Sequence, residues 1–414
     1  MLYNAYEFQR SLLAGASTMA DMGASWMQNP ANPFSYSAMG PVVASALDVF
    51  AHASAPRGKP DFGLASTLVD GRTVAVTEEI VVAKPFGDLK RFRRANLDGS
   101  FVEGGPRLLI VAPMSGHFAT LLRGTVERML PGHDVYITDW HDAKYVPLSA
   151  GSFDLDNYVD YLVEFLDAIA AVDGKRPHML AVCQPSVPCY AAVALMSADD
   201  HPARPATLTM MGGPVDTREA PTKVNTMATE RAHSWFANNV IATIPYSYPG
   251  AGRRVYPGFL QLAGFMTMNL DNHLNSHWEM FKHLVAGDGD SADATKDFYD
   301  EYRSVCDMTA EFYLQTVDAV FQRHLLPKGE LTHRGRPVDP AAITDVAVLA
   351  IEGERDDISG VGQTKAALTL ATALPDALKQ YHLAPEVGHY GIFNGRKWRE
   401  RIAPVVEQWI AAHD

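Results

Sequence analysis

Cys183 stands between an apolar run at 178–182 and a helical run of small residues at 187–195. The order strand, sharp turn, helix is the setting of a nucleophile elbow, whose usual pattern is Gly-x-Ser-x-Gly. The three key positions here hold Ala181, Cys183 and Pro185. A cysteine thiolate is a strong nucleophile, and proline suits a first helical turn, where a backbone N–H has no partner to lose. Taken alone, the motif also fits a buried structural cysteine at a strand end.

A nucleophilic cysteine needs a base, and the base needs an acid that orients it. In the hydrolases that carry this elbow, the acid and then the histidine follow the nucleophile, each just past a later strand. Two blocks fit this order: Glu-Gly-Glu-Arg-Asp, which ends at Asp356, and Gly-His-Tyr-Gly, which contains His389. Asp356 is preferred to Asp357 because Gly-x-x-Asp brings its side chain to the usual turn position. The sequence therefore predicts a triad of Cys183, His389 and Asp356.

An acyl-transfer site also needs two N–H donors for the oxyanion. Gln184, directly after the nucleophile, supplies one. The other should follow the apolar run at 107–112, where counting from the strand end favours Met114, with Ser115 second and also a candidate to contact substrate. We interpret His117 as a supporting residue at the start of the next helix rather than as a second catalytic histidine.

Composition narrows the class of protein. The chain has 414 residues, 47% hydrophobic and 20% charged, which is typical of a soluble globular protein. A net charge of −13, without a Lys/Arg-rich run, argues against a nucleic-acid partner. Three cysteines are too few for a disulfide framework, so we expect a reducing, cytoplasmic compartment. Neither a secretory signal nor an apolar run of transmembrane length is evident.

Strands and helices alternate along most of the chain. A hairpin is expected at 73–97, and a clear amphipathic helix at 155–172. Such alternation predicts a mostly parallel, doubly wound α/β sheet. The further strands are expected at 107–112, 134–138, 178–182, 206–211, 346–352 and 378–383, and the further helices at 119–130, 187–195 and 398–412.

Three regions follow from this pattern. Residues 1–70 form an arm of helices and loops, and residues 71–213 with 346–414 form the core. The arm could pack on its own domain or on a partner, so a homo-oligomer stays open. Residues 214–345 interrupt the core as a helical lid rich in aromatic residues. These rings are either the lid's own small core or a substrate surface, for which the leading candidates are Trp235, Tyr246, Tyr248 and Trp278.

No metal or organic cofactor is expected. His273 and His277 have the spacing of metal ligands, but Leu274 stands where a zinc protease has its glutamate. No glycine-rich phosphate loop is present.

Five blocks together resemble the intracellular poly(3-hydroxybutyrate) (PHB) depolymerases, and the resemblance covers nearly the whole chain. It implies an α/β-hydrolase fold with a helical lid, the triad Cys183, His389 and Asp356, and hydrolysis of the storage polyester at cytoplasmic granules. Secreted depolymerases of this polymer carry a serine elbow and a signal peptide instead. The blocks are Val111–Arg123, Thr138–Ala143, Ala181–Ser186, Glu352–Asp356 and Gly388–Gly391.

Two alternatives stay open. Polyhydroxyalkanoate synthases also use a cysteine elbow, but of the form Gly-x-Cys-x-Gly, whereas Ala181 and Pro185 replace both glycines here. A non-catalytic granule-coat protein could have kept the fold, although an intact triad in order argues against it. Product length, side-chain tolerance and the choice of water or CoA as the second acceptor are not determined by the sequence.

Overall fold

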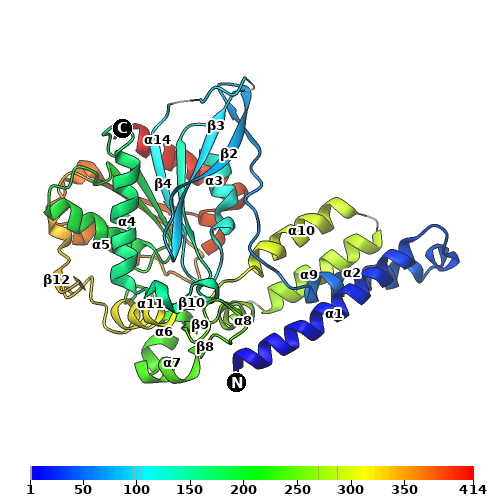
Figure 1. The fold of residues 1–414 in the computed structure, drawn as a ribbon. Helices are drawn as coiled ribbons and strands as arrows, with labels where there is room; N and C mark the ends of the chain where they lie inside the picture. Colours follow the sequence, from blue (N-terminus) through cyan, green and yellow to red (C-terminus); the bar gives the residue numbers. More distant parts are fainter. Residues whose placement is uncertain (1, 97, 103, 269, 287) are drawn as a thin grey trace.

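A nine-stranded sheet lies at the centre of the computed structural model (Figure 1), which describes residues 2–96, 98–102, 104–268, 270–286 and 288–414. Along the sheet, the first three strand pairings are antiparallel and the remaining five are parallel. The fold is thus the expected α/β class with a mostly parallel sheet. In sheet order the strands are β1 (Ser66–Val69), β2 (Arg72–Val82), β3 (Gly87–Ala95), β5 (Asp134–Trp140), β4 (Arg107–Val111), β6 (His178–Val182), β7 (Thr207–Met211), β13 (Ala347–Gly353) and β14 (Lys379–Ala384).

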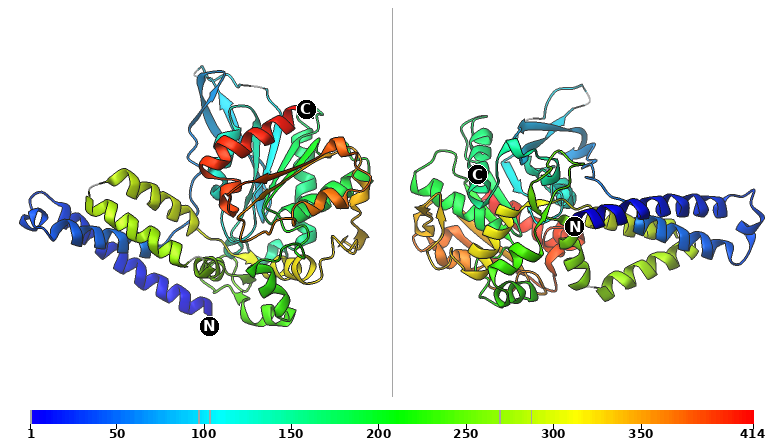
Figure 2. Two further views of the ribbon diagram at one scale, coloured as in Figure 1. Left: turned by 180° about the vertical axis from the view of Figure 1, so that it is seen from behind. Right: turned by 60° about the horizontal axis from the view of Figure 1, so that its bottom comes forward.

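Helices cover both faces of the sheet (Figures 1 and 2). The helices α4 (Leu155–Ala170) and α5 (Ser186–Ala198) lie on one face, and α3 (Arg123–Met129) and α14 (Ala403–Ala411) on the other. The central parallel strands are buried on both sides, which is why their sequences are continuously apolar rather than alternating. A short helix α12 (Ala366–Leu370) lies between β13 and β14 in the chain.

The helix α4 shows how local sequence sets an element. The Asp154 side chain accepts the Asn157 N–H, and the Asn157 side chain accepts the Asp154 N–H, which satisfies two otherwise unpaired donors at the helix start. Its apolar residues recur at helical spacing and form the buried face, as the sequence predicts. Two other expected helices are less regular: residues 119–130 begin with a 3₁₀ turn, Ala119–Leu122, and the final helix begins with a wide turn, Trp398–Ile402.

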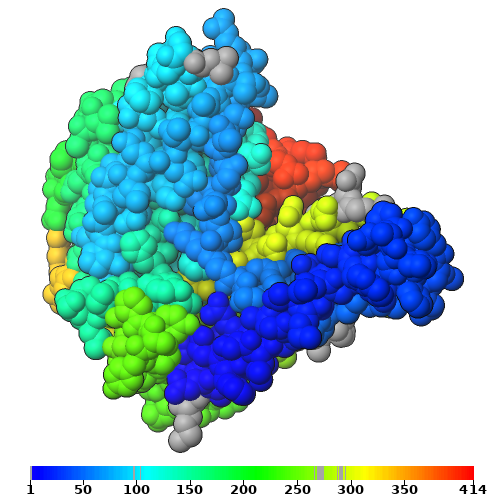
Figure 3. Space-filling model, turned by 45° about the vertical axis from the view of Figure 1, so that its right-hand side comes forward, coloured from blue at the N-terminus to red at the C-terminus, as the bar shows by residue number. Residues whose placement is uncertain are grey.

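The arm is a helical hairpin that projects from the core (Figures 1 and 3). It consists of α1 (Leu2–Gln28) and α2 (Gly40–Ser54), joined through a 3₁₀ turn at Pro33–Tyr36. The Ser17 hydroxyl donates to the Ala51 carbonyl 2.8 Å away and ties the two helices together. Strand β1, which the sequence assigned to the arm, pairs with β2 and lies in the sheet instead.

The insertion between β7 and β13 divides into three parts. The helices α9 (Leu270–Ala286) and α10 (Gly289–Tyr302) run beside the arm (Figures 1 and 2). Nearer the core lies a small sheet with the helices around it. The last part, a short hairpin at 332–337, packs on the outside of the core, where His333 lies 2.9 Å from Asp160 of α4. The elements of the second and third parts are α6 (Lys223–Glu230), α7 (His233–Asn239), β8 (Ala242–Thr243), β9 (Arg254–Tyr256), α8 (Gly258–Met268), β10 (Met308–Thr309), α11 (Ala310–Thr316), β11 (Thr332–His333) and β12 (Arg336–Pro337).

Among the described residues, no helix combines the length and apolar character needed to cross a bilayer.

Candidate active site

Cys183 occupies the sharp turn between β6 and α5. Its φ of +67° lies in the left-handed region, which costs a non-glycine residue about 1–2 kcal/mol. Backbone hydrogen bonds hold the turn: the Cys183 N–H donates to the Met211 carbonyl (2.7 Å), and the Ser186 N–H donates to the Cys183 carbonyl (3.1 Å). A Cβ added at Gly213, just after β7, would lie 1.9 Å from Ser186 Oγ, so only glycine fits at this position. The turn has the strained geometry of a nucleophile elbow.

Cys183 differs from the other two cysteines in its exposure to solvent. Cys183 is partly exposed, whereas Cys189 in α5 and Cys306 in the insertion are buried. Burial raises the pKa of the Cys189 and Cys306 thiols well above their ordinary value. A buried thiol with a raised pKa is unreactive, so only the Cys183 sulfur is open to a reagent or substrate.

His389 and Asp356 meet at the carboxyl ends of the neighbouring strands. His389 Nδ1 lies 2.8 Å from Asp356 Oδ2, and the two side chains are 5% and 0% exposed. The other carboxylate oxygen, Asp356 Oδ1, accepts the N–H groups of Ile358 (2.9 Å) and Ser359 (2.8 Å), which fixes its direction. Asp357 is exposed, so the turn directs the first aspartate and not the second towards the imidazole.

Charge around His389 favours its protonated form. Burial alone would lower the pKa of His389. The neighbouring Cys183 and Asp356, together with the hydrogen bond between the imidazole and the Asp356 carboxylate, outweigh this effect and raise that pKa well above its usual value. The imidazole therefore bridges the sulfur and the carboxylate, and it can exchange a proton with the sulfur.

A buried carboxylate behind this pair, Glu352, organises the loop at 362–365. It accepts three N–H groups of that loop at 2.7 to 2.9 Å and the Tyr381 hydroxyl at 2.7 Å. Thr364 in the same loop exchanges hydrogen bonds with both backbone groups of Gly213, beside the elbow. The sequence analysis uses this block only for Asp356. A glutamate near the end of an otherwise apolar strand is the sequence signal that could have predicted the buried role of Glu352.

Gly212 is a further residue that sequence reasoning missed. Its φ is +60°, and a Cβ there would lie 3.2 Å from both Asp356 Oδ2 and His389 Cε1. Both the backbone conformation and the space available therefore favour glycine directly beneath the imidazole–carboxylate pair. The two consecutive glycines after β7 are the sequence signal that could have predicted a crowded position there.

The expected oxyanion donors adjoin the elbow. The Met114 N–H donates to the Gln184 side-chain carbonyl at 3.2 Å. This expected oxyanion donor is therefore already paired with the side chain of Gln184. Within the described part of the chain, Gln184 Nε2 is buried without a hydrogen-bond partner. Ser115 is half-buried beside Met114. His117 Nε2 donates to the Tyr302 carbonyl at 3.0 Å, and burial lowers its pKa to about 4, so it is a neutral tie between this loop and the insertion.

Aromatic rings surround the imidazole. Tyr390 and Phe393 lie edge-on to His389, with ring centroids 5.8 and 5.7 Å away. Tyr302, at the end of α10, contacts Tyr390 at 5.8 Å and stacks on Phe298 at 5.5 Å. Burial, and then the neighbouring Tyr302 and Cys183, raise the pKa of Tyr390 well above its usual value. Tyr302 is thus an aromatic residue of the insertion next to the site, and it was not among the four expected.

Those four aromatic residues lie farther out. Tyr246 is 99% exposed, and Trp278 is 58% exposed and stacks on Phe281. Tyr248 packs edge-on against Tyr3 of the arm, with centroids 6.4 Å apart. Trp235 lies under the guanidinium of Arg231, 4.3 Å from its ring centroid. Their role towards substrate stays a prediction.

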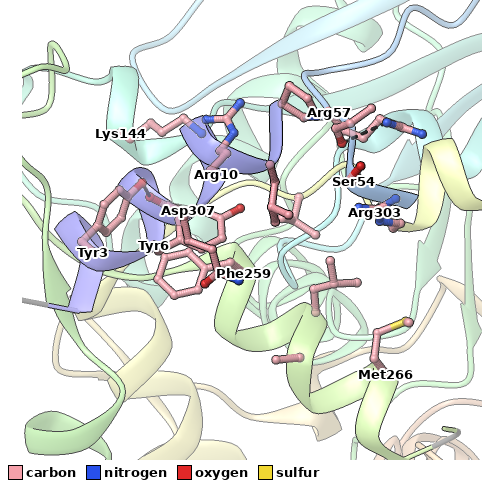
Figure 4. Close-up of a pocket in the computed structure, with 17 residues that line it drawn as sticks. Tyr3, Tyr6, Arg10, Ser54, Arg57, Lys144, Phe259, Met266, Arg303 and Asp307 are labelled. Carbon is pink, nitrogen blue, oxygen red and sulfur yellow. Dashed lines mark hydrogen bonds between the residues drawn. The ribbon is translucent and has the colours of Figure 1, made fainter. Parts of the chain in front are cut away.

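A cavity of about 310 Å³ lies at the foot of the arm, and its lining includes none of the three candidate catalytic residues (Figure 4). Asp307 at its edge accepts the Tyr3 hydroxyl (2.6 Å) and the Gly258 N–H (2.9 Å). Burial, and then the nearby Asp142 carboxylate, raise the pKa of Asp307 to about 7. This carboxyl group fastens the start of α1 to the insertion.

The described residues contain no group of three or more His, Cys, Asp or Glu side chains able to hold a metal ion. The His273 side chain lies outside the described residues. The His277 ring packs 4.2 Å from that of Tyr299.

Strand order, elbow and the imidazole–carboxylate pair together define an α/β-hydrolase. Residues 212–414 match the family model described as "PHB de-polymerase C-terminus". This carboxyl-terminal part of the chain is therefore similar to that of the PHB depolymerases.

Solved structures that match the chain include 2-hydroxy-6-oxo-6-phenylhexa-2,4-dienoate hydrolase from Rhodococcus sp. strain RHA1. It is 11% identical, with 82% of this chain and 100% of that chain covered and a TM-score of 0.45. A thermophilic esterase from Thermogutta terrifontis is 13% identical, with 84% and 98% covered and a TM-score of 0.41. No curated protein matches the chain.

Proposed function

We propose that this chain hydrolyses the backbone ester bonds of poly(3-hydroxybutyrate), with Cys183 as nucleophile, His389 as general base and Asp356 as the residue that orients it. The carrying observation is the buried pair of His389 and Asp356, 2.8 Å apart, next to Cys183 at a strained elbow, with Cys183 close enough to raise the pKa of the imidazole. The family match over residues 212–414 supports the choice of substrate.

The first half of the reaction forms a thioester. His389 Nε2 takes the proton of the Cys183 thiol, and the sulfur attacks the carbonyl carbon of an ester bond in the polymer. The carbonyl oxygen becomes an oxyanion. When the tetrahedral intermediate collapses, the carbon–oxygen bond breaks, and the alcohol end of the chain leaves with the proton from His389. The acyl part stays on the sulfur.

The second half consumes water. His389 removes a proton from a water molecule, whose oxygen attacks the thioester carbonyl. Collapse returns the sulfur, which regains its proton from His389, and releases 3-hydroxybutyrate or an oligomer with a free carboxylate. Asp356 keeps the imidazole in the tautomer that offers Nε2 to the sulfur and stabilises the imidazolium that forms in both halves.

The oxyanion needs donors at the elbow. The N–H groups of Gln184 and Met114 are our candidates, and Ser115 is the neighbouring candidate for substrate contact. Because the Gln184 side chain accepts the Met114 N–H, that amide must turn away when a substrate oxygen enters. The insertion then provides the apolar surface for a weakly polar polyester chain, with Trp235, Tyr246, Tyr248 and Trp278 as the proposed outer contacts. On this proposal the enzyme works at storage granules in the cytoplasm.

The test is product analysis on amorphous polymer particles. The wild type should release 3-hydroxybutyrate or its oligomers, and Cys183→Ala should lose at least about 10³-fold of this rate, because triad members act as a unit. Cys189→Ala, which removes a buried thiol one turn into α5, is the matched control and should keep most activity. Iodoacetamide should inactivate the enzyme and label Cys183.

Three outcomes contradict the proposal. Full activity in Cys183→Ala would refute the nucleophile. Polymer growth from hydroxybutyryl-CoA without release from particles would indicate a synthase. Binding to particles without any product would indicate a coat protein.

A further inference from the structure

The outward side of the arm carries large apolar side chains that nothing in the described chain covers. Each belongs to α1 and is 54% to 75% exposed. They are Phe8, Leu12, Met19, Met22 and Trp26. The opposite side of α1, with Ser17, Ala20 and Ala24, is buried against the rest of the protein. The helix therefore has two apolar faces, of which the hairpin uses one.

The exposed residues follow a heptad pattern. Together with Ala5 and Gly15, they are separated alternately by three and four residues along α1. This alternation is the a/d spacing of a coiled-coil seam, narrower than the stripe that a helix shows to a broad surface. The pattern favours another helix as the partner of this face.

We propose that the exposed seam of α1 packs antiparallel against α1 of a second copy of this chain, so that the protein is a dimer joined through its arms. The seam is symmetric about position 17. An antiparallel partner therefore sets Phe8 opposite Trp26 of the partner subunit, Leu12 opposite Met22 of the partner subunit, and Gly15 opposite Met19 of the partner subunit. A twofold axis at this position makes one surface complementary to itself.

The residues flanking the seam permit this close pairing. They are small or uncharged on both sides: Gln9, Ala16 and Gly23 on one, and Ser11, Thr18 and Ser25 on the other. No like charges therefore meet across the axis. A Cβ at Gly15 would have no atom within 4 Å, so this position is open for the Met19 side chain of the partner subunit.

The same flanks argue against an anionic lipid surface as the occupant. A surface-binding helix of that type carries Lys or Arg beside its apolar face. The only basic residue of α1 is Arg10, which lines the cavity at the foot of the arm (Figure 4).

The area is sufficient for a stable dimer. Two of the five side chains are aromatic and three are Leu or Met; at roughly 190 Å² each, exposures of 54% to 75% present roughly 600 Å² per subunit. Burying both copies removes roughly 1,200 Å², which is at the lower end of stable interfaces. The hairpin projects from the core, with the first turns of α1 at its foot and the end of α1 farthest from the core (Figures 1 and 2).

Sedimentation of the full chain tests the proposal. The wild type should sediment at twice the chain mass of 45.2 kDa. The double variant Leu12→Glu/Met19→Glu should sediment as a monomer with unchanged cleavage of a short soluble ester. Leu68→Glu, which changes an equally exposed apolar residue on β1, is the control and should leave the dimer intact.

Cysteine cross-linking tests the direction of the two helices. The double variant Phe8→Cys/Trp26→Cys should form a disulfide-linked dimer, whereas Phe8→Cys alone should not, because position 8 faces position 26 and not itself.

The proposal is overturned by a wild type that is monomeric at tens of micromolar, or by a dimer that survives Leu12→Glu/Met19→Glu. It is equally overturned if the wild type is monomeric and only its binding to polymer particles falls in that variant, since the seam would then dock on polymer. None of these measurements depends on the reaction that the core catalyses.

Discussion

At the scale of single residues, backbone strain and hydrogen bonds orient the side chains of Cys183, Asp356 and His389. The positive φ of Cys183 lifts the thiol out of the turn, and two N–H groups lock the Asp356 carboxylate towards His389. Because each effect depends on only a few atoms, single substitutions should show which residues orient the imidazole.

The paired aspartates give a matched test. Asp356→Asn should lower kcat for a soluble ester by about 10²- to 10⁴-fold, because the amide no longer selects the correct imidazole tautomer. Asp357→Asn changes an exposed neighbour and should stay within about twofold. Steady-state kinetics of both variants show which aspartate orients the imidazole. A larger loss of activity in Asp357→Asn would assign that role to Asp357 instead.

Gly212 allows a second test at this scale. Gly212→Ala introduces a Cβ 3.2 Å from both members of the imidazole–carboxylate pair at a positive φ. We expect a loss of about 1–2 kcal/mol in unfolding free energy and a fall of at least about tenfold in kcat. Gly264→Ala is the control, since its Cβ would meet nothing within 4 Å in an exposed part of α8. Unchanged kinetics in Gly212→Ala would show that the pair tolerates displacement.

At the scale of elements, the insertion contacts both the arm and the site. Its helices α9 and α10 extend beside the arm, and α10 ends at Tyr302, whose ring contacts Tyr390 next to the imidazole. The His117–Tyr302 hydrogen bond fastens the same helix end to the loop that carries Met114. A change in the position of α10 would therefore reach both sides of the site.

The outer aromatic residues of the insertion should matter for polymer and not for small esters. Tyr246→Ala and Trp278→Ala remove exposed rings, so we expect polymer hydrolysis to fall several-fold while the melting temperature and soluble-ester activity stay unchanged. Tyr248→Ala should differ, because its ring packs on Tyr3 and its loss also weakens the foot of the arm. If all three variants lower stability and both activities in parallel, the rings are only a structural core.

At the scale of the whole molecule, the junction of arm and core depends on a buried carboxyl group. Asp307, with Tyr3, Asp142 and Lys144 around it, has a pKa raised from 3.8 to about 7. An acid with a raised folded-state pKa keeps its proton in the folded protein while the unfolded chain has lost it. Its ionisation therefore lowers the free energy of unfolding as pH rises from about 4 to about 7, and by a constant amount above that.

Asp307→Asn should remove this contribution. The isosteric amide can still pair with Tyr3 and the Gly258 N–H, so the variant should gain stability relative to the wild type as pH rises from 5 to 8. Urea unfolding at several pH values measures the difference. A difference that is the same at every pH would contradict the raised pKa.

The sequence alone determined the parts of the protein that follow from local pattern and order. Continuous apolar runs predicted the parallel strands, and the order of Cys183, Asp356 and His389 after three of them predicted which residues meet, because carboxyl ends of parallel strands share one edge. His389 and Asp356 are in contact as expected, while their catalytic role stays a proposal.

Tertiary packing decided the rest. Gly212 and Glu352 act through space on residues far along the chain, so their neighbours in sequence give little sign of their task. Tyr302, rather than the four named aromatic residues, lies next to Tyr390, because which face of a lid helix turns inward depends on what it packs against. The heptad spacing of α1 is present in the sequence, but only the fold shows that the described residues leave this face exposed.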